Sequence, residues 1–172
     1  MSVYAYVGSN PVNAVDPFGL DTLVIVGGPS DGNPFGHIAI AFTGRGVYSY
    51  GTKEGLGTSV TTYLQNQSAY RSSVVYRINS TPEQEAKMLA RILSYDGKSL
   101  PDPHSDLMAA MKDTCATRTE DALGVGGFAS PFPTGPNFLP GSVGGIAAWN
   151  ASSIYFLPQG GAVPSSFGSF NP

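Results

Sequence analysis

The chain has 172 residues, which is enough for one compact domain of about 150 residues and a short leader. Charged residues make up only 12%, and the net charge of −3 offers no basic surface for nucleic acid. One cysteine excludes an internal disulfide, and no stretch reaches the ~18–20 apolar residues of a membrane span. We find no signal peptide and expect any export to depend on a larger carrier.

Residues 1–20 read as the end of a different protein. Residues 4–6 (YAY) alternate aromatic and small side chains, 8–11 (GSNP) form a turn signal, and 16–20 (DPFGL) close the segment. This segment resembles the closing motif of the RHS/YD-repeat core, the large β-shell of bacterial polymorphic toxins. In that family a variable effector domain follows the final Leu.

The resemblance implies that residues 21–172 are an effector domain used in interbacterial competition. It implies secretion as cargo of a larger RHS protein, delivery into a target cell, and two partners: the upstream RHS shell and a cognate immunity protein. The family cleaves itself after the final Leu with Asp residues of its closing motifs, which points to Asp16 and to the bond after Leu20. Half of that apparatus lies upstream, so we expect no self-cleavage here; alternatively, Asp16 is a turn residue before Pro17.

Apolar and β-branched runs predict the strands of a small antiparallel sheet. The runs are 22–26, 37–42, 47–50, 73–78 and 153–157. A short Gly-containing connection at 43–46 predicts a hairpin between the second and third runs, and the last run reads as an edge strand.

Helix signals follow the fourth predicted strand. Ser80 or Thr81 caps a helix over 83–95, with Pro82 in its first turn. Residues 105–123 read as helical in two pieces that meet near 113–114. The Gly/Pro-rich segment 124–147 reads as a loop packed over the domain, and the last dozen residues as loosely held. The predicted fold class is therefore α+β, a sheet packed on two or three helices.

One thiol and two imidazoles carry the candidate chemistry. Cys115 follows Asp113 and Thr114; if either caps a helix, the thiol lies in the first turn, where free N–H groups stabilise a thiolate. Alternatively, Leu107, Met111 and Cys115 form the apolar stripe of one unbroken helix, and the Cys is an inert core residue.

The two histidines differ in their surroundings. His37 begins a predicted strand, where a side chain can face a cleft, or it is a structural His bonded to a neighbouring loop. His104 lies in the Pro-rich segment 101–105, and we expect it to be exposed and without a catalytic role.

Three segments, 36–42 (GHIAIAF), 47–51 (VYSYG) and 113–117 (DTCAT), resemble the circularly permuted papain-like hydrolases, which include lecithin-retinol-acyltransferase-like and NlpC-type enzymes. The resemblance implies a permuted papain-like fold with Cys115 as nucleophile and His37 as base. It implies a polar orienting group on the next strand, where Ser49 is the first choice and Tyr50 the second. Many members carry Asn before the Cys, where this chain has Thr114.

A Cys–His pair at a helix start supports acyl transfer. We expect a thiol hydrolase acting on amide bonds (peptidase, amidase or deamidase) of peptidoglycan or protein. The alternatives are a lipid acyl hydrolase or acyltransferase using the same pair, with a membrane or lipid substrate, and a non-enzymatic toxin that disrupts membranes. We expect no cofactor and no metal, because two His and scattered Asp show no ligand-spaced cluster.

Overall fold

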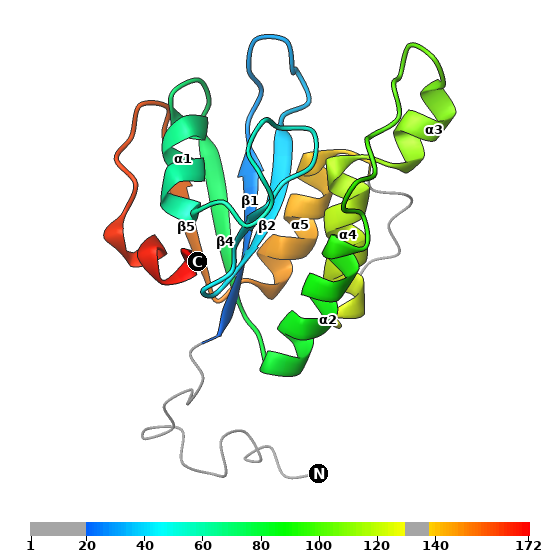
Figure 1. The fold of residues 1–172 in the computed structure, drawn as a ribbon. Coiled ribbons are helices and arrows are strands. Elements are labelled where there is room, and N and C mark those ends of the chain that lie inside the picture. The colour runs from blue at the N-terminus through cyan, green and yellow to red at the C-terminus, as the bar shows by residue number, and fades with distance from the viewer. Residues whose placement is uncertain (1–19, 130–137) are drawn as a thin grey trace, which may run out of the picture.

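One antiparallel sheet forms the centre of the computed structural model, which describes residues 20–129 and 138–172 (Figure 1). Within these residues the sheet has five strands, and the predicted α+β class is confirmed. In spatial order they are β3 (Gly46–Tyr48), β2 (His37–Phe42), β1 (Asp21–Gly27), β4 (Ser73–Asn79) and β5 (Ser153–Leu157). The RHS-like segment, including Asp16, lies outside the described residues except for Leu20.

The strands follow the predicted apolar runs closely. β1 and β2 pair along their length, with Val24 opposite Ile40, and almost every residue in them is buried. The predicted hairpin joins β2 to β3, and β5 is an edge strand as expected. β3 ends at Tyr48, so Ser49 and Tyr50 lie just beyond the sheet.

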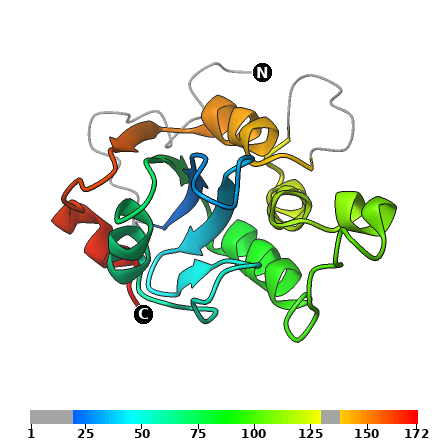
Figure 2. The ribbon, with the colours of Figure 1, turned by 90° about the horizontal axis from the view of Figure 1, so that it is seen from above.

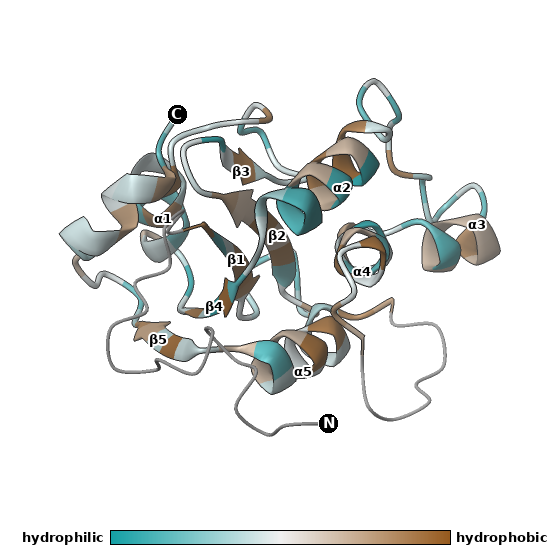
Figure 3. Ribbon diagram, turned by 90° about the horizontal axis from the view of Figure 1, so that it is seen from below, coloured by the Kyte–Doolittle hydropathy of each residue, from teal (hydrophilic) through white to brown (hydrophobic). Residues whose placement is uncertain are grey.

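Helices cover both faces of the sheet (Figure 2). One face carries α2 (Pro82–Leu93), α4 (Cys115–Val125) and α5 (Pro140–Asn150); the other carries α1 (Val60–Ser68) and the 3-10 helix η2 (Ser165–Phe170). Side chains alternate along β2, with Ile38 and Ile40 in the first core and Ala39 in the second. Figure 3 shows hydrophobic residues concentrated on the strands and on the helices that pack against them.

The predicted helix starts agree with the structure. Thr81 caps α2 and forms a capping box with Gln84, with Pro82 at the first helical position. The segment predicted to be helical in two pieces is α3 (Leu107–Lys112) followed by α4, and the break falls at Asp113 and Thr114.

Three predictions about irregular regions were wrong or incomplete. Of the loop expected over 124–147, residues 140–147 form the start of α5, a helix with three glycines, and residues 130–137 lie outside the described residues. A Cβ on Gly144 would lie 3.2 Å from Val26 Cγ2, so the small residue lets α5 approach β1 closely. Helix α1 was missed. The last dozen residues are not loosely held, because η2 buries Phe167 and Phe170 against the second core.

Candidate active site

Cys115 is the first residue of α4. The Thr114 hydroxyl accepts a hydrogen bond from the Thr117 N–H (3.1 Å), and the Thr117 hydroxyl accepts one from the Thr114 N–H (2.8 Å). This capping box starts the helix at Cys115, next to first-turn N–H groups that no carbonyl of the helix can satisfy. Since α3 ends at Lys112, the alternative of one unbroken helix with an apolar Cys stripe is wrong.

Arg118 holds the break between α3 and α4 in place. Its Nε donates to Asp113 Oδ1 (2.6 Å) and its Nη2 to Asp113 Oδ2 (2.8 Å), while Nη1 donates to the Lys98 carbonyl (2.9 Å). The guanidinium carbon also lies 4.6 Å from the ring centroid of Tyr50 and 4.9 Å from that of Tyr95. A buried cation therefore fixes the residues that immediately precede the thiol.

His37 is the first residue of β2 and is buried. The preceding Gly36 has φ 78°, and a Cβ there would lie 2.3 Å from the Gly27 carbonyl oxygen, so only glycine allows this approach to β1. Alternation along β2 places His37 on the face of Ala39, the α1 side, whereas α4 packs on the other face. His37 and Cys115 reach one cavity at the end of the sheet where β2 begins.

The hydroxyl of Ser49 contacts the imidazole. His37 Nε2 lies 2.7 Å from Ser49 Oγ, which also accepts from Thr52 Oγ1 (3.1 Å) and lies 3.5 Å from the Tyr63 hydroxyl oxygen. Ser49 can accept from both Thr52 and His37 Nε2–H, which leaves Nδ1 as the basic nitrogen. Tyr50, the second choice, is not in contact with His37 through its hydroxyl, which donates to the Ile92 carbonyl (2.6 Å).

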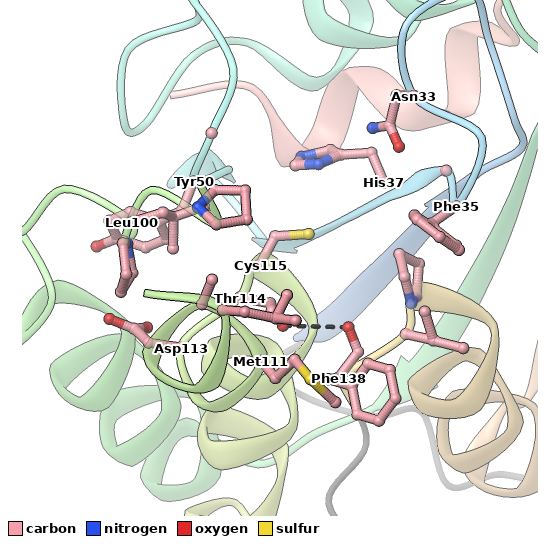
Figure 4. A pocket seen from close by; sticks show the side chains of 18 residues that line it. Asn33, Phe35, His37, Tyr50, Leu100, Met111, Asp113, Thr114, Cys115 and Phe138 are labelled. Carbon is pink, nitrogen blue, oxygen red and sulfur yellow. Dashed lines mark hydrogen bonds between the residues drawn. The ribbon is translucent and has the colours of Figure 1, made fainter. Parts of the chain in front are cut away.

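A cavity of about 540 Å³ brings His37 and Cys115 together (Figure 4). Its walls are mostly apolar and come from four segments of the chain. They include Phe35, Leu107, Met111, Phe138 and Leu139. Thr114 Oγ1 donates to the Phe138 carbonyl (3.3 Å, dashed in Figure 4), which ties the segment before α5 to the cap of the cysteine helix.

A second cavity, of about 720 Å³, shares Asn33, His37 and Gly51 with the first. Its remaining lining is polar and charged, in contrast to the apolar walls around Cys115. These residues are Ser30, Asp31, Gly32, Thr52, Lys53, Glu54, Tyr70 and Arg71. His37 therefore lies between an apolar and a polar cavity.

Burial sets the protonation states of the two candidate groups. It lowers the pKa of His37 to about 4, with the positive charge of Arg71 adding to the effect and Glu54 opposing it. Burial also raises the pKa of the Cys115 thiol, although backbone N–H groups of Ile38, Ala116 and Cys115 stabilise the thiolate. At neutral pH both the Cys115 thiol and the His37 imidazole are neutral, and a neutral imidazole can accept a proton.

The other sequence candidates lie elsewhere. His104 is exposed on its loop, as expected, and its backbone N–H donates to Asp102 Oδ1 (2.9 Å). The Leu20 carbonyl accepts a hydrogen bond from the Ser80 N–H (3.2 Å), and Leu20 does not line the cavity that contains Cys115. Residues 20–129 and 138–172 contain no cluster of three or more His, Cys, Asp or Glu side chains that could hold a metal ion.

Three residues that support the site carry no clear signal in the sequence. Tyr63 comes from the unpredicted α1, Arg71 from the turn after it, and Arg118 from inside α4. No motif marks any of them; only the Asp113–Arg118 spacing near a helix start could have indicated an ion pair. In the described parts of the chain no helix is long and apolar enough to cross a membrane. The chain matches no family model, no curated protein and no solved structure.

Proposed function

We propose that this protein is a cysteine hydrolase in which Cys115 is the nucleophile, His37 the general base and Ser49 the positioning residue. The observation that carries the proposal is the shared cavity: it contains a thiol at a helix N-terminus and a buried imidazole whose Nε2 contacts a hydroxyl. An inert core cysteine needs neither a capping box beside it nor an open cavity in front of it.

The reaction follows from these groups. His37 Nδ1 accepts the thiol proton as the Cys115 sulfur attacks the substrate carbonyl carbon, and the carbonyl π electrons move to oxygen. Backbone N–H groups next to the thiol, at the start of α4 and at Ile38, are the donors we assign to that oxyanion. The oxyanion collapses, the bond to the leaving group breaks, and His37 returns the proton to the leaving amine. Water then hydrolyses the acyl-cysteine by the same steps.

Amide bonds of peptidoglycan peptides or of a protein are the proposed target, in keeping with an RHS-type effector. One observation favours a second candidate, a lipid acyl hydrolase or acyltransferase. The cavity wall is largely apolar, and two of its residues, Phe35 and Leu107, are 71% and 61% exposed, so an acyl chain could cover them.

Toxicity and thiol labelling test the mechanism together. Cys115 is the only cysteine, so iodoacetamide adds one carboxamidomethyl group that intact mass detects. We expect Cys115→Ala to abolish toxicity in a bacterial host and His37→Gln to slow labelling at neutral pH. His104→Gln is the matched control, because it removes an exposed imidazole outside the cavity, and it should leave both readouts unchanged. Full toxicity of Cys115→Ala contradicts the thiol mechanism.

Two further assays separate the candidate reactions. Release of peptides from purified peptidoglycan supports the amidase, whereas hydrolysis of p-nitrophenyl esters that accelerates with acyl chain length supports the lipid reaction. Dye release from liposomes by Cys115→Ala at the wild-type rate supports the non-enzymatic alternative instead. Each readout uses the same purified chain, so the outcomes are directly comparable.

A further inference from the structure

Arg71 is a buried cation that lacks a full set of partners. Its side chain is 7% exposed, and its Nη1 donates to the Gly28 carbonyl (3.3 Å), but its buried Nε has no hydrogen-bond partner within residues 20–129 and 138–172. No carboxylate of those residues forms an ion pair with it. A buried guanidinium in this state is costly, because its lost hydration is not replaced.

The surrounding chain fixes where Arg71 can point. Its backbone N–H donates to the Gln67 carbonyl (3.0 Å), its guanidinium lies 4.8 Å from the Tyr70 ring centroid, and its Cδ lies 2.7 Å from where a Cβ on Gly27 would stand. Gly27 therefore makes room for the side chain. From this position Arg71 lines the polar cavity together with His37.

The other charged residues of the polar cavity do not neutralise Arg71. Asp31 and Lys53 are exposed, so solvent screens their charges. Glu54 is half-buried, but neither Glu54 nor Asp31 lies within ion-pair distance of the guanidinium. Arg71 is thus the buried charge of this cavity. An anion that enters the cavity would give the guanidinium the ion-pair partner that the described chain does not supply.

We propose that Arg71 binds an anionic group of the substrate in the polar cavity while the acyl group on the other side of the scissile bond occupies the apolar cavity. The proposal rests on the proposed function and deepens it: the substrate is an acyl compound with a carboxylate or phosphate close to the bond that Cys115 attacks. Such a substrate spans His37, which lines both cavities.

Two alkylating probes that differ mainly in charge test this assignment. Iodoacetate is an anion and iodoacetamide its neutral counterpart, and both react with the one thiol. The measured quantity is the ratio of the iodoacetate rate to the iodoacetamide rate, divided by the same ratio for glutathione. Because both probes sense the same thiolate fraction, the ratio is unaffected by any change in the pKa of Cys115.

We expect a normalised ratio above one that falls about tenfold in Arg71→Gln and persists in Arg71→Lys, with melting curves showing that each variant is folded. Lys53→Gln is the matched control: it removes the same charge from the same cavity, but from an exposed side chain, so its effect should be small. A ratio that is equal in folded wild type and Arg71→Gln overturns the inference. A thiol that reacts with neither probe overturns the proposed function instead.

Competition identifies the anion. Sodium acetate or inorganic phosphate, compared at equal ionic strength with chloride, should slow iodoacetate labelling of the wild type and not of Arg71→Gln. Stronger competition by acetate assigns a carboxylate, as in an acidic peptide, and stronger competition by phosphate assigns a phosphate, as in a lipid headgroup. No competition by either anion speaks against the site.

Discussion

Substitution of Asp113 by Asn should destabilise the fold severely, although Asp113 itself is 36% exposed. Its partner Arg118 is 1% exposed, and the carboxylate is the only negative charge that contacts this buried cation among the described residues. The Asn side chain removes that charge and leaves the guanidinium with the Lys98 and Ser99 carbonyls and two aromatic rings.

The expected loss of stability follows from the difference in burial between Arg118 and Asp113. Breaking a buried ion pair by removing one partner costs about 3–5 kcal/mol, because an uncompensated charge remains buried. Arg118→Met should cost less, about 2–3 kcal/mol, since Asp113 can be hydrated and the main losses are two ring contacts and two carbonyl hydrogen bonds. Once Arg118 is Met, Asp113→Asn has little left to disturb, so the coupling energy between the two sites should be close to the full cost of Asp113→Asn, about 3–5 kcal/mol.

Urea unfolding followed by circular dichroism at pH 7 measures all four corners of this double-mutant cycle. Asp113→Asn should lower the free energy of unfolding more than Arg118→Met, and the double variant should resemble Arg118→Met. Strictly additive effects, or an Asp113→Asn variant within 1 kcal/mol of the wild type, would refute the idea that Arg118 depends on this carboxylate. Slower iodoacetamide labelling of the folded Asp113→Asn variant would link the pair to Cys115.

Four other changes test the site and the residues that support it. Ser49→Ala should slow iodoacetamide labelling of Cys115 about tenfold and shift the pH at which labelling is half-maximal, because His37 Nε2 loses its hydroxyl partner. Labelling rates measured at several pH values check this. Gly36→Ala should cost more than 1 kcal/mol in urea unfolding, because it combines φ 78° with a backbone clash. Between pH 6.5 and about 4 the unfolded state protonates His37 and the native state does not, so acid removes up to about 3 kcal/mol of stability through this group, measured as the stability that His37→Gln gains relative to the wild type on acidification. Glu85, whose buried carboxyl has its pKa raised to about 7, acts in the opposite direction over an overlapping range and offsets His37 in the wild type. Glu85→Gln removes this offset, so its stability should fall with acid more steeply than that of the wild type.

The sequence predicted β1 and β2 well because these two strands are buried on both faces. Each is a short, continuous apolar run next to glycines, as is typical of a fully buried strand. Helix α5 was missed for the opposite reason. Its glycines are poor helix formers, and the helix is favoured by its close packing on Val26 of β1, a contact that no local pattern records.

The candidate site could be predicted only in part, because several of its residues are set by long-range contacts. Cys115 and His37 could be selected by residue type and by the turns before them, and Ser49 by its place after a strand. The roles of Tyr63, Arg71 and Arg118 depend on long-range contacts, for instance the approach of Arg71 to Gly27 and Gly28, which are more than 40 residues away in sequence. Burial, not residue type, also keeps His37 neutral down to about pH 4.

Arg71 connects the neutral resting pair to substrate binding. The guanidinium is the second cause, after burial, of the lowered pKa of His37, and it lines the polar cavity with His37 but not the apolar cavity with Cys115. A substrate anion bound to Arg71 would offset that charge and raise the pKa of His37 more than it changes the thiol. Proton transfer from Cys115 would then become easier only when a matching substrate is present. A protein with this coupling keeps its thiol protonated until a substrate anion binds, which also limits the reaction of the thiol with unrelated electrophiles.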